Sequence, residues 1–154
     1  MSAIRCLFLM LLVTAVGCGS GIKEFPVSKV EGTLTCGGSP VPHAFVHFQP
    51  MRAGNSATVG KAAFAVADEE GHFVLSTYGT GDGAVIAHHR VRVSYPTGEK
   101  LDSFQCNCQI GDGYDQMEVD ITEGEDHNIE VILLKPKGPI KKLTRRERED
   151  LEDI

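Results

Sequence analysis

Apolar and polar residues alternate along most of this chain, and this two-residue period restricts its fold more than any other feature. In the first such segment, Val30, Gly32 and Leu34 alternate with polar side chains. Successive side chains of a strand point to opposite faces, so the pattern predicts strands with one buried face. Between these segments we find no convincing helical period. We predict seven strands, in the segments 30–36, 43–48, 64–66, 73–75, 90–95, 117–121 and 129–133.

The predicted strands are separated by glycine, proline and acidic residues. Examples are the segments 37–40 (GGSP), 68–71 (DEEG) and 123–126 (EGED). Glycine reaches positive φ and proline cannot join a hydrogen-bonded ladder, so these segments predict turns. Short strands joined by frequent turns are typical of an all-β, antiparallel β-sandwich. We place this domain at residues 29–135.

Residues 1–17 are arranged like a secretory signal. An apolar run follows Arg5, and small residues lie at Ala15 and Gly17. The run is shorter than the roughly 20 apolar residues that a spanning helix needs. The segment 15–18 (AVGC) resembles the lipobox of bacterial lipoproteins, in which the cysteine becomes the acylated N-terminus, although alanine replaces the usual leucine at its first position. The alternative is an ordinary secretory signal that is cleaved at the same bond.

The lipobox resemblance implies lipidation at Cys18 and export to the bacterial cell envelope. Several acyl chains would hold the protein on a membrane without a spanning helix. Residues 18–28 begin with Gly19-Ser20-Gly21 after the cysteine and are interpreted as a flexible tether. Glycine rather than aspartate at position 19 favours sorting to the outer membrane. The expected partner is therefore a membrane, reached through the lipid anchor.

Charge is distributed unevenly along the chain. The 154 residues carry a net charge of −6, but residues 18–134 hold 7 basic and 16 acidic side chains, a net charge of −9. Nucleic-acid binding requires clustered lysine and arginine, so this balance excludes it for the folded part. Residues 136–154 form a short charged tail. We interpret the tail as solvated, and electrostatic contact with an acidic envelope surface is the alternative.

The cysteines are the most informative candidates for chemistry. With Cys6 in the signal and Cys18 assigned to the lipid, three remain: Cys36, Cys106 and Cys108. An exported chain meets an oxidising environment, so we expect a disulfide from Cys36 to Cys106 or Cys108, with one thiol left free. The alternative is a soft-metal site built from the Cys106-Asn107-Cys108 pair with Cys36 or a histidine.

The six histidines do not form a metal motif in the sequence. His43 and His47 lie four residues apart on one predicted strand, about 13 Å along it, so they cannot hold one ion together. His88 and His89 are neighbours that point to opposite faces if the chain is extended there. We expect all six to be solvated surface side chains. We predict no metal site, cofactor or catalytic residue.

Four segments resemble the carboxypeptidase regulatory-like domains and small lipoproteins of this kind. Residues 30–35 (VEGTLT) and 38–44 (GSPVPHA) are similar to their V-x-G-x-V and G-x-P-L-x-G-A opening, and residues 68–73 (DEEGHF) to their T-D-x-x-G-x-F hairpin. Residues 76–84 (STYGTGDGA) resemble the T-T-Y-x-x-G-D-G-A segment of small lipoproteins of this kind in planctomycete envelopes. The family usually continues with Pro-Pro-Gly-x-Tyr, whereas this chain has VIAHH at 85–89.

This resemblance implies a seven-stranded, Greek-key, transthyretin-like (prealbumin-like) sandwich. Members of the family are mostly of unknown function. The same fold includes hydroxyisourate hydrolases, whose C-terminal Tyr-Arg-Gly-Ser is missing here, and the chain has no Gly-x-Ser-x-Gly nucleophile motif. We therefore expect a non-catalytic, lipid-anchored envelope protein that acts as a binding or structural module, with an envelope protein or polysaccharide as its candidate partner. The alternative is a Cys/His soft-metal-binding or redox lipoprotein of the envelope.

Overall fold

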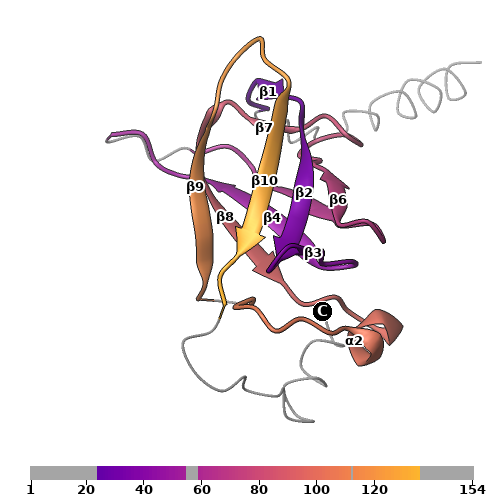
Figure 1. Cartoon of the computed structure of the whole chain (residues 1–154). Helices are drawn as coiled ribbons and strands as arrows, with labels where there is room; N and C mark the ends of the chain where they lie inside the picture. The colour runs from indigo at the N-terminus through magenta and orange to yellow at the C-terminus, as the bar shows by residue number, and fades with distance from the viewer. Residues whose placement is uncertain (1–23, 55–58, 112, 136–154) are drawn as a thin grey trace, which may run out of the picture.

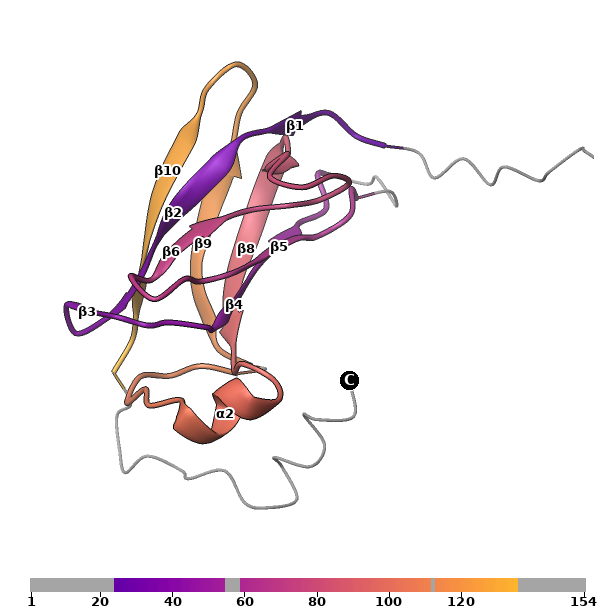
Figure 2. The same ribbon diagram turned by 90° about the vertical axis from the view of Figure 1, so that its right-hand side faces the viewer.

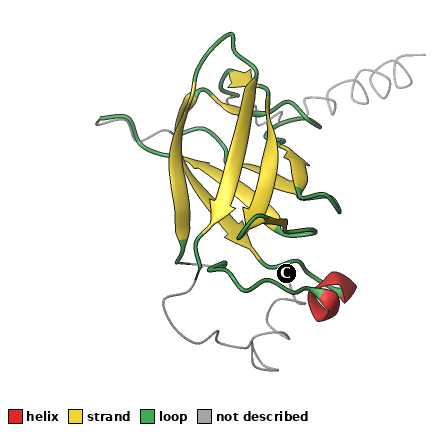
Figure 3. Ribbon diagram, in the orientation of Figure 1, coloured by secondary structure: helices red, strands yellow, loops and turns green. Residues whose placement is uncertain are grey.

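Strands form almost all of the regular structure in the computed structural model, which describes residues 24–54, 59–111 and 113–135. Two four-stranded sheets face each other around one core, and a short helix lies below one end of them (Figures 1 and 3). The prediction of an all-β fold is confirmed. The strands are β1 (Val27–Ser28), β2 (Val30–Cys36), β3 (Ser39–Pro40), β4 (Phe45–Pro50), β5 (Ala63–Val66), β6 (His72–Val74), β7 (Ala84–Val85), β8 (Ala87–Ser94), β9 (Asp115–Ile121) and β10 (His127–Leu133), and the helix is α2 (Glu99–Ser103).

One sheet has the order β5-β4-β8-β9, and all its pairs are antiparallel. In the other sheet, β2 pairs with β10 along one edge and with β3 and β6 along the opposite edge. The β2–β10 pair is parallel, with Val30 opposite His127 and Cys36 opposite Leu133. The prediction of a purely antiparallel sandwich is therefore wrong for this pair. Helix α2 also corrects the expectation that no helix lies between the strands.

The core confirms that the two-residue period marks a buried face. In β2, Val30 and Leu34 are buried while Glu31 and Thr33 are exposed, and β10 alternates in the same way. Phe48 from one sheet packs against Phe73 from the other, with ring centroids 6.3 Å apart. Burying apolar side chains from both sheets stabilises the fold by roughly 25 cal/mol for each Å² removed from water.

The segment 76–84 folds into a turn that is built around Asp82. The Asp82 carboxylate accepts the backbone N–H groups of Thr77, Tyr78 and Gly79 at 2.7, 2.9 and 2.8 Å. Burial opposes ionisation of this carboxyl, but the N–H donors outweigh burial and hold its pKa below the ordinary value. These donors are therefore already used inside the turn, and the segment serves as a connection rather than as a phosphate-binding loop.

The same turn fixes the start of the domain. The Phe25 N–H donates to the Tyr78 hydroxyl at 3.1 Å, and the Ile86 N–H donates to the Pro26 carbonyl at 3.0 Å. Strand β1 then pairs with β7, so the chain is attached to the sandwich from Phe25 onward. The resemblance segment 76–84 thus has a structural role in this chain.

His43 adopts a backbone conformation that favours glycine. Its φ is +64°, and β4 begins only at Phe45, so His43 lies in the turn before the strand. The prediction that His43 and His47 share one strand is therefore wrong. The G-x-P-L-x-G-A pattern has glycine where this chain has His43, which agrees with the positive φ. The His43 Nε2 atom lies 3.1 Å from Glu69 Oε1 and 3.2 Å from Lys100 Nζ.

We expect a His43→Gly variant to be about 1 kcal/mol more stable than a His43→Ala variant. Both variants lose the imidazole and its contacts, but only glycine removes the cost of a left-handed backbone at this position. Urea unfolding of the two variants beside wild type measures the difference. Equal stabilities of the glycine and alanine variants would show that the backbone at position 43 carries no strain.

Candidate functional site

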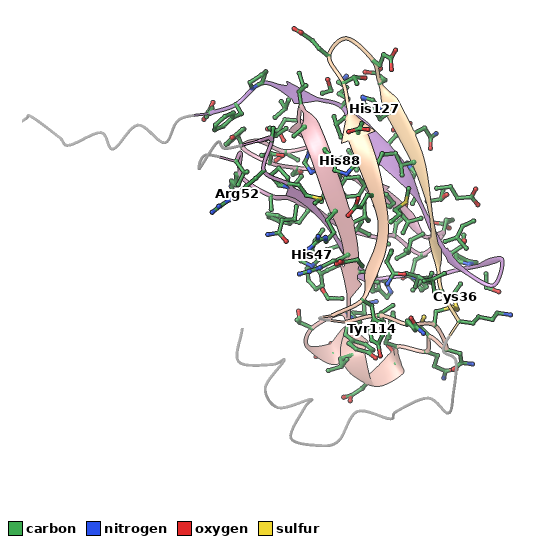
Figure 4. The ribbon with its side chains drawn as sticks, turned by 90° about the vertical axis from the view of Figure 1, so that its left-hand side faces the viewer. Cys36, His47, Arg52, His88, Tyr114 and His127 are labelled. Atoms are coloured by element: carbon green, nitrogen blue, oxygen red, sulfur yellow. A yellow bond between two sulfur atoms is a disulfide. The ribbon has the colours of Figure 1, made fainter. Side chains whose placement is uncertain are left out.

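Three cysteine sulfurs lie together at the end of the sandwich that carries α2. The Sγ atoms of Cys36, Cys106 and Cys108 all lie within 4.8 Å of one another. Cys36 and Cys108 form a disulfide with their Cα atoms 6.0 Å apart, and Cys106 has a free thiol. Of the two pairings expected from the sequence, the structure has the one with Cys108. Figure 4 shows Cys36 at this end of the molecule and His127 at the other.

The two sheets hold the disulfide in place. Cys36 is the last residue of β2 and lies between Leu133 of β10 and Ser39 of β3. The loop that carries Cys106 and Cys108 is held by two backbone hydrogen bonds. The Gln109 N–H donates to the Leu134 carbonyl at 2.7 Å, and the Gly111 N–H donates to the Val93 carbonyl at 2.8 Å. Cys108 and Ile110 are buried in the common core. The cysteine loop is therefore attached to both sheets.

The remainder of the 96–116 loop also packs against the sandwich. Leu101 of α2 is buried, and the rings of Tyr95 and Phe104 make an edge contact with centroids 6.0 Å apart. Figure 2 shows α2 and this loop lying below the ends of the strands. The packing shows that this segment forms a lid over one end of the core.

The free thiol of Cys106 is half-buried and weakly acidic. Burial raises its pKa, and the N–H of Cys108, which donates to the sulfur, offsets this effect only in part. A protonated thiol is a poor nucleophile near neutral pH. It can still bind a soft metal ion, which displaces the proton. The cluster is thus better suited to ligation or to slow thiol–disulfide exchange than to rapid catalysis.

Lys135 lies beside the turn that follows Cys36. A Cβ atom added at Gly37, the residue after Cys36, would lie 3.1 Å from the Lys135 Cε atom and 3.4 Å from its Nζ atom. The lysine side chain therefore lies across the turn that follows Cys36. No pattern in the sequence connects Lys135 with this turn.

None of the described histidines joins the three sulfurs as a ligand. His88 is exposed on β8, where its ring nitrogens lie 3.1 Å from Glu118 Oε2 and 2.8 Å from Asp120 Oδ1. His89 faces the core and is fully buried, with its Nε2 atom 2.7 Å from the Val85 carbonyl oxygen. The two side chains point to opposite faces, as predicted, but the prediction of a solvated His89 is wrong because its strand position belongs to the core face.

These two histidines should give opposite pH dependences of stability. Burial lowers the pKa of His89, so the unfolded chain takes up a proton more readily, and stability falls as the pH drops below 6.5. Hydrogen bonds from His88 to Glu118 and Asp120 raise the pKa of His88. Its contribution is therefore complete below pH 6.5 and is lost as the pH rises through the raised pKa.

Urea unfolding between about pH 5 and pH 8 separates the two effects. We expect a His88→Gln variant to lose stability on acidification more steeply than wild type, and a His89→Leu variant to lose it less steeply. Wild type should lie between them. Three parallel curves of stability against pH would contradict both assignments.

A shallow hollow beside β2 offers little for ligand binding. It has a volume of about 190 Å³ and lies between Lys29, Glu31, Val74 and the start of β10. Small-molecule sites are usually about 300–1,000 Å³. The hollow is therefore too small to support a ligand proposal, and the three cysteines remain the stronger candidate.

Comparisons with other proteins do not identify the chain. No family model, curated protein or solved structure matches it. Within residues 24–54, 59–111 and 113–135, no helix has the length and apolar character to cross a bilayer. Cys18, the signal segment 1–17 and the charged tail 136–154 lie outside the described residues.

Proposed function

We propose that this chain is an exported, lipid-anchored, non-catalytic β-sandwich of the bacterial envelope that acts as a binding or structural module. The main observation in support of the proposal is that the folded domain begins only a few residues after Cys18, the candidate acylation site. Phe25 is already bonded to Tyr78, only seven residues after Cys18. Seven residues span at most about 25 Å. An acylated Cys18 would therefore hold the sandwich close to the membrane surface.

We also propose that the fold is a seven-stranded, Greek-key, transthyretin-like sandwich. Each of the seven longer strands overlaps one of the seven predicted segments; these strands are β2, β4, β5, β6, β8, β9 and β10. The resemblance segments at 30–44 and 76–84 supply the support for this family. The parallel β2–β10 pair is a feature that any such assignment has to include.

The proposed anchor gives the sandwich an orientation. Strand β1 and helix α2 lie at opposite ends of the molecule (Figures 1 and 2). With the membrane at the β1 end, the cysteine cluster and the 96–116 lid would face away from the bilayer. This end would then be available to an envelope protein or polysaccharide. Glycine at position 19 supports the outer membrane as the site of attachment.

Metabolic labelling with an alkyne analogue of palmitate tests the anchor. We expect wild type to be labelled and to partition into detergent, whereas a Cys18→Ala variant should be neither labelled nor processed. A Cys6→Ala variant is the matched control, because Cys6 lies inside the signal and should leave labelling unchanged. Unlabelled wild type that is nevertheless cleaved before Cys18 would refute lipidation and leave an ordinary exported protein.

A second candidate function is soft-metal binding or thiol redox chemistry in the envelope. Its support is the approach of three sulfurs to within 4.8 Å of one another. Elemental analysis of protein purified without reductant or chelator, together with counting of free thiols, tests this candidate. Stoichiometric copper or zinc would support metal binding. A single free thiol, that of Cys106, with no metal would favour the disulfide-linked structural module.

A further inference from the structure

We infer that Cys36, Cys106 and Cys108, when all three are reduced, form a binding site for one Cu(I) ion. This inference rests on the second candidate function and names its ligand. It does not depend on the lipid anchor, which is tested separately. The disulfide form of the chain, as the structure has it, is then the closed state of the site.

The spacing of the sulfurs fits a single ion. Metal–thiolate bonds are about 2.3 Å long, so three thiolates around one ion lie about 4 Å from one another. The three Sγ atoms already lie within 4.8 Å of one another. Only Cys36 and Cys108 have to separate, and their Cα atoms, 6.0 Å apart, allow this by side-chain rotation.

The number and kind of ligands favour Cu(I). Thiolates select soft ions such as Cu(I) and also bind zinc, but a closed structural zinc site normally has four protein ligands. Among the described residues, the cluster contains three sulfurs and no histidine or carboxylate. Cu(I) is satisfied by three thiolates in a plane. The cluster therefore matches Cu(I) better than Zn²⁺.

The surroundings of the cluster affect the charge of a bound complex and the placement of its ligands. Three thiolates and one Cu(I) ion carry a net charge of −2. Lys135 lies across Gly37 next to Cys36, and the Cys108 N–H donates to the Cys106 sulfur. The N–H donor favours the Cys106 thiolate but only partly offsets burial, so the bound ion has to displace the thiol proton. Attachment of the loop to Leu134 and Val93 keeps the ligands in place before the ion arrives.

The oxidation state of Cys36 and Cys108 determines whether the site can bind Cu(I). In the disulfide form, two of the three sulfurs are bonded to each other, so only Cys106 remains. A dithiol reductant supplies two electrons and two protons to the Cys36–Cys108 bond, yielding two thiols, and is itself converted to a disulfide. Binding of Cu(I) then displaces the thiol protons.

Anaerobic titration with Cu(I) against a coloured Cu(I) chelator tests the inference on the full mature chain in detergent. We expect reduced wild type to bind one Cu(I) ion and oxidised wild type to bind at least about 100-fold more weakly, because two ligands are lost. A reduced Cys106→Ser variant should also bind at least about 100-fold more weakly. Asn107→Ser, a change at the exposed residue between the two loop cysteines, is the matched control and should bind like wild type.

A second measurement covers the case in which reduction unfolds the protein. Cu(I) should raise the Tm of reduced wild type and leave that of reduced Cys106→Ser nearly unchanged, because an ion that binds only the folded chain stabilises it. Equal affinities and equal Tm shifts for these two proteins would overturn the inference. Preferential uptake of zinc over Cu(I) would also overturn it, while the broader soft-metal function would still stand.

Discussion

A Cys36→Ser variant is expected to unfold with a free energy about 4 kcal/mol below that of wild type. The Cys36–Cys108 disulfide joins residues 72 positions apart, and closing a loop of this length removes about 4 kcal/mol of chain entropy from the unfolded state. Urea unfolding without reductant measures the loss. A Cys106→Ser variant is the control, since it keeps the disulfide and should remain within about 1 kcal/mol of wild type.

The third cysteine makes this experiment more discriminating. Cys106 lies close enough to Cys36 to replace Cys108 as its disulfide partner. We therefore expect a Cys108→Ser variant to lose less stability than Cys36→Ser, and peptide mapping should find a Cys36–Cys106 bond in it. Equal losses for the two variants would contradict this substitution of partners. A Cys36→Ser protein as stable as wild type would contradict the disulfide itself.

A Gly83→Ala variant is expected to lose about 3 kcal/mol of stability. Gly83 has a φ of +95°, and a Cβ atom added there would overlap the backbone carbonyl of Ser28. An L-residue with such a φ costs about 1–2 kcal/mol, and moving the Ser28 backbone away adds about 1–3 kcal/mol. The overlap lies where β1 joins the domain, so the substitution should loosen that strand as well.

Variants at two other glycines of the same turn separate the cost of the positive φ from the cost of the overlap. Gly81 has a φ of +66° but has room for a Cβ atom, which would lie 3.6 Å from Val74 Cγ1, so Gly81→Ala should cost only about 1–2 kcal/mol. Gly79 has neither a positive φ nor a close neighbour, and Gly79→Ala should be within about 0.5 kcal/mol of wild type. A Gly83→Ala protein no less stable than Gly81→Ala would rule out the overlap.

The two-residue period was enough to predict the longer strands but not how they pair. In β2 and β10, regular alternation marks the buried face, and both strands lie in the predicted segments. Their parallel pairing depends on how the chain returns from β9, which no local pattern records. Strands β1, β3 and β7 have two residues each, too few for any period. Helix α2 has five residues and was missed for the same reason.

The candidate site could be predicted only in part. The sequence favoured a bond from Cys36 to one of the two loop cysteines, but two cysteines separated by one residue cannot be distinguished without the path of the loop. His89 is different, because a usable signal was present. Counting back by twos from the buried Val93 and Val91 of β8 places His89 on the core face. The alternation of buried and exposed residues could therefore have predicted the burial of His89.

The parallel pairing of β2 and β10 has a mechanical consequence. The chain enters β2 at the β1 end of the sandwich and leaves β10 beside Cys36, at the opposite end. A force between the chain before β1 and the residues after β10 would pull these neighbouring strands lengthwise in opposite directions. All seven residues of β10 are paired with β2, so their hydrogen bonds would resist together in shear instead of opening one after another.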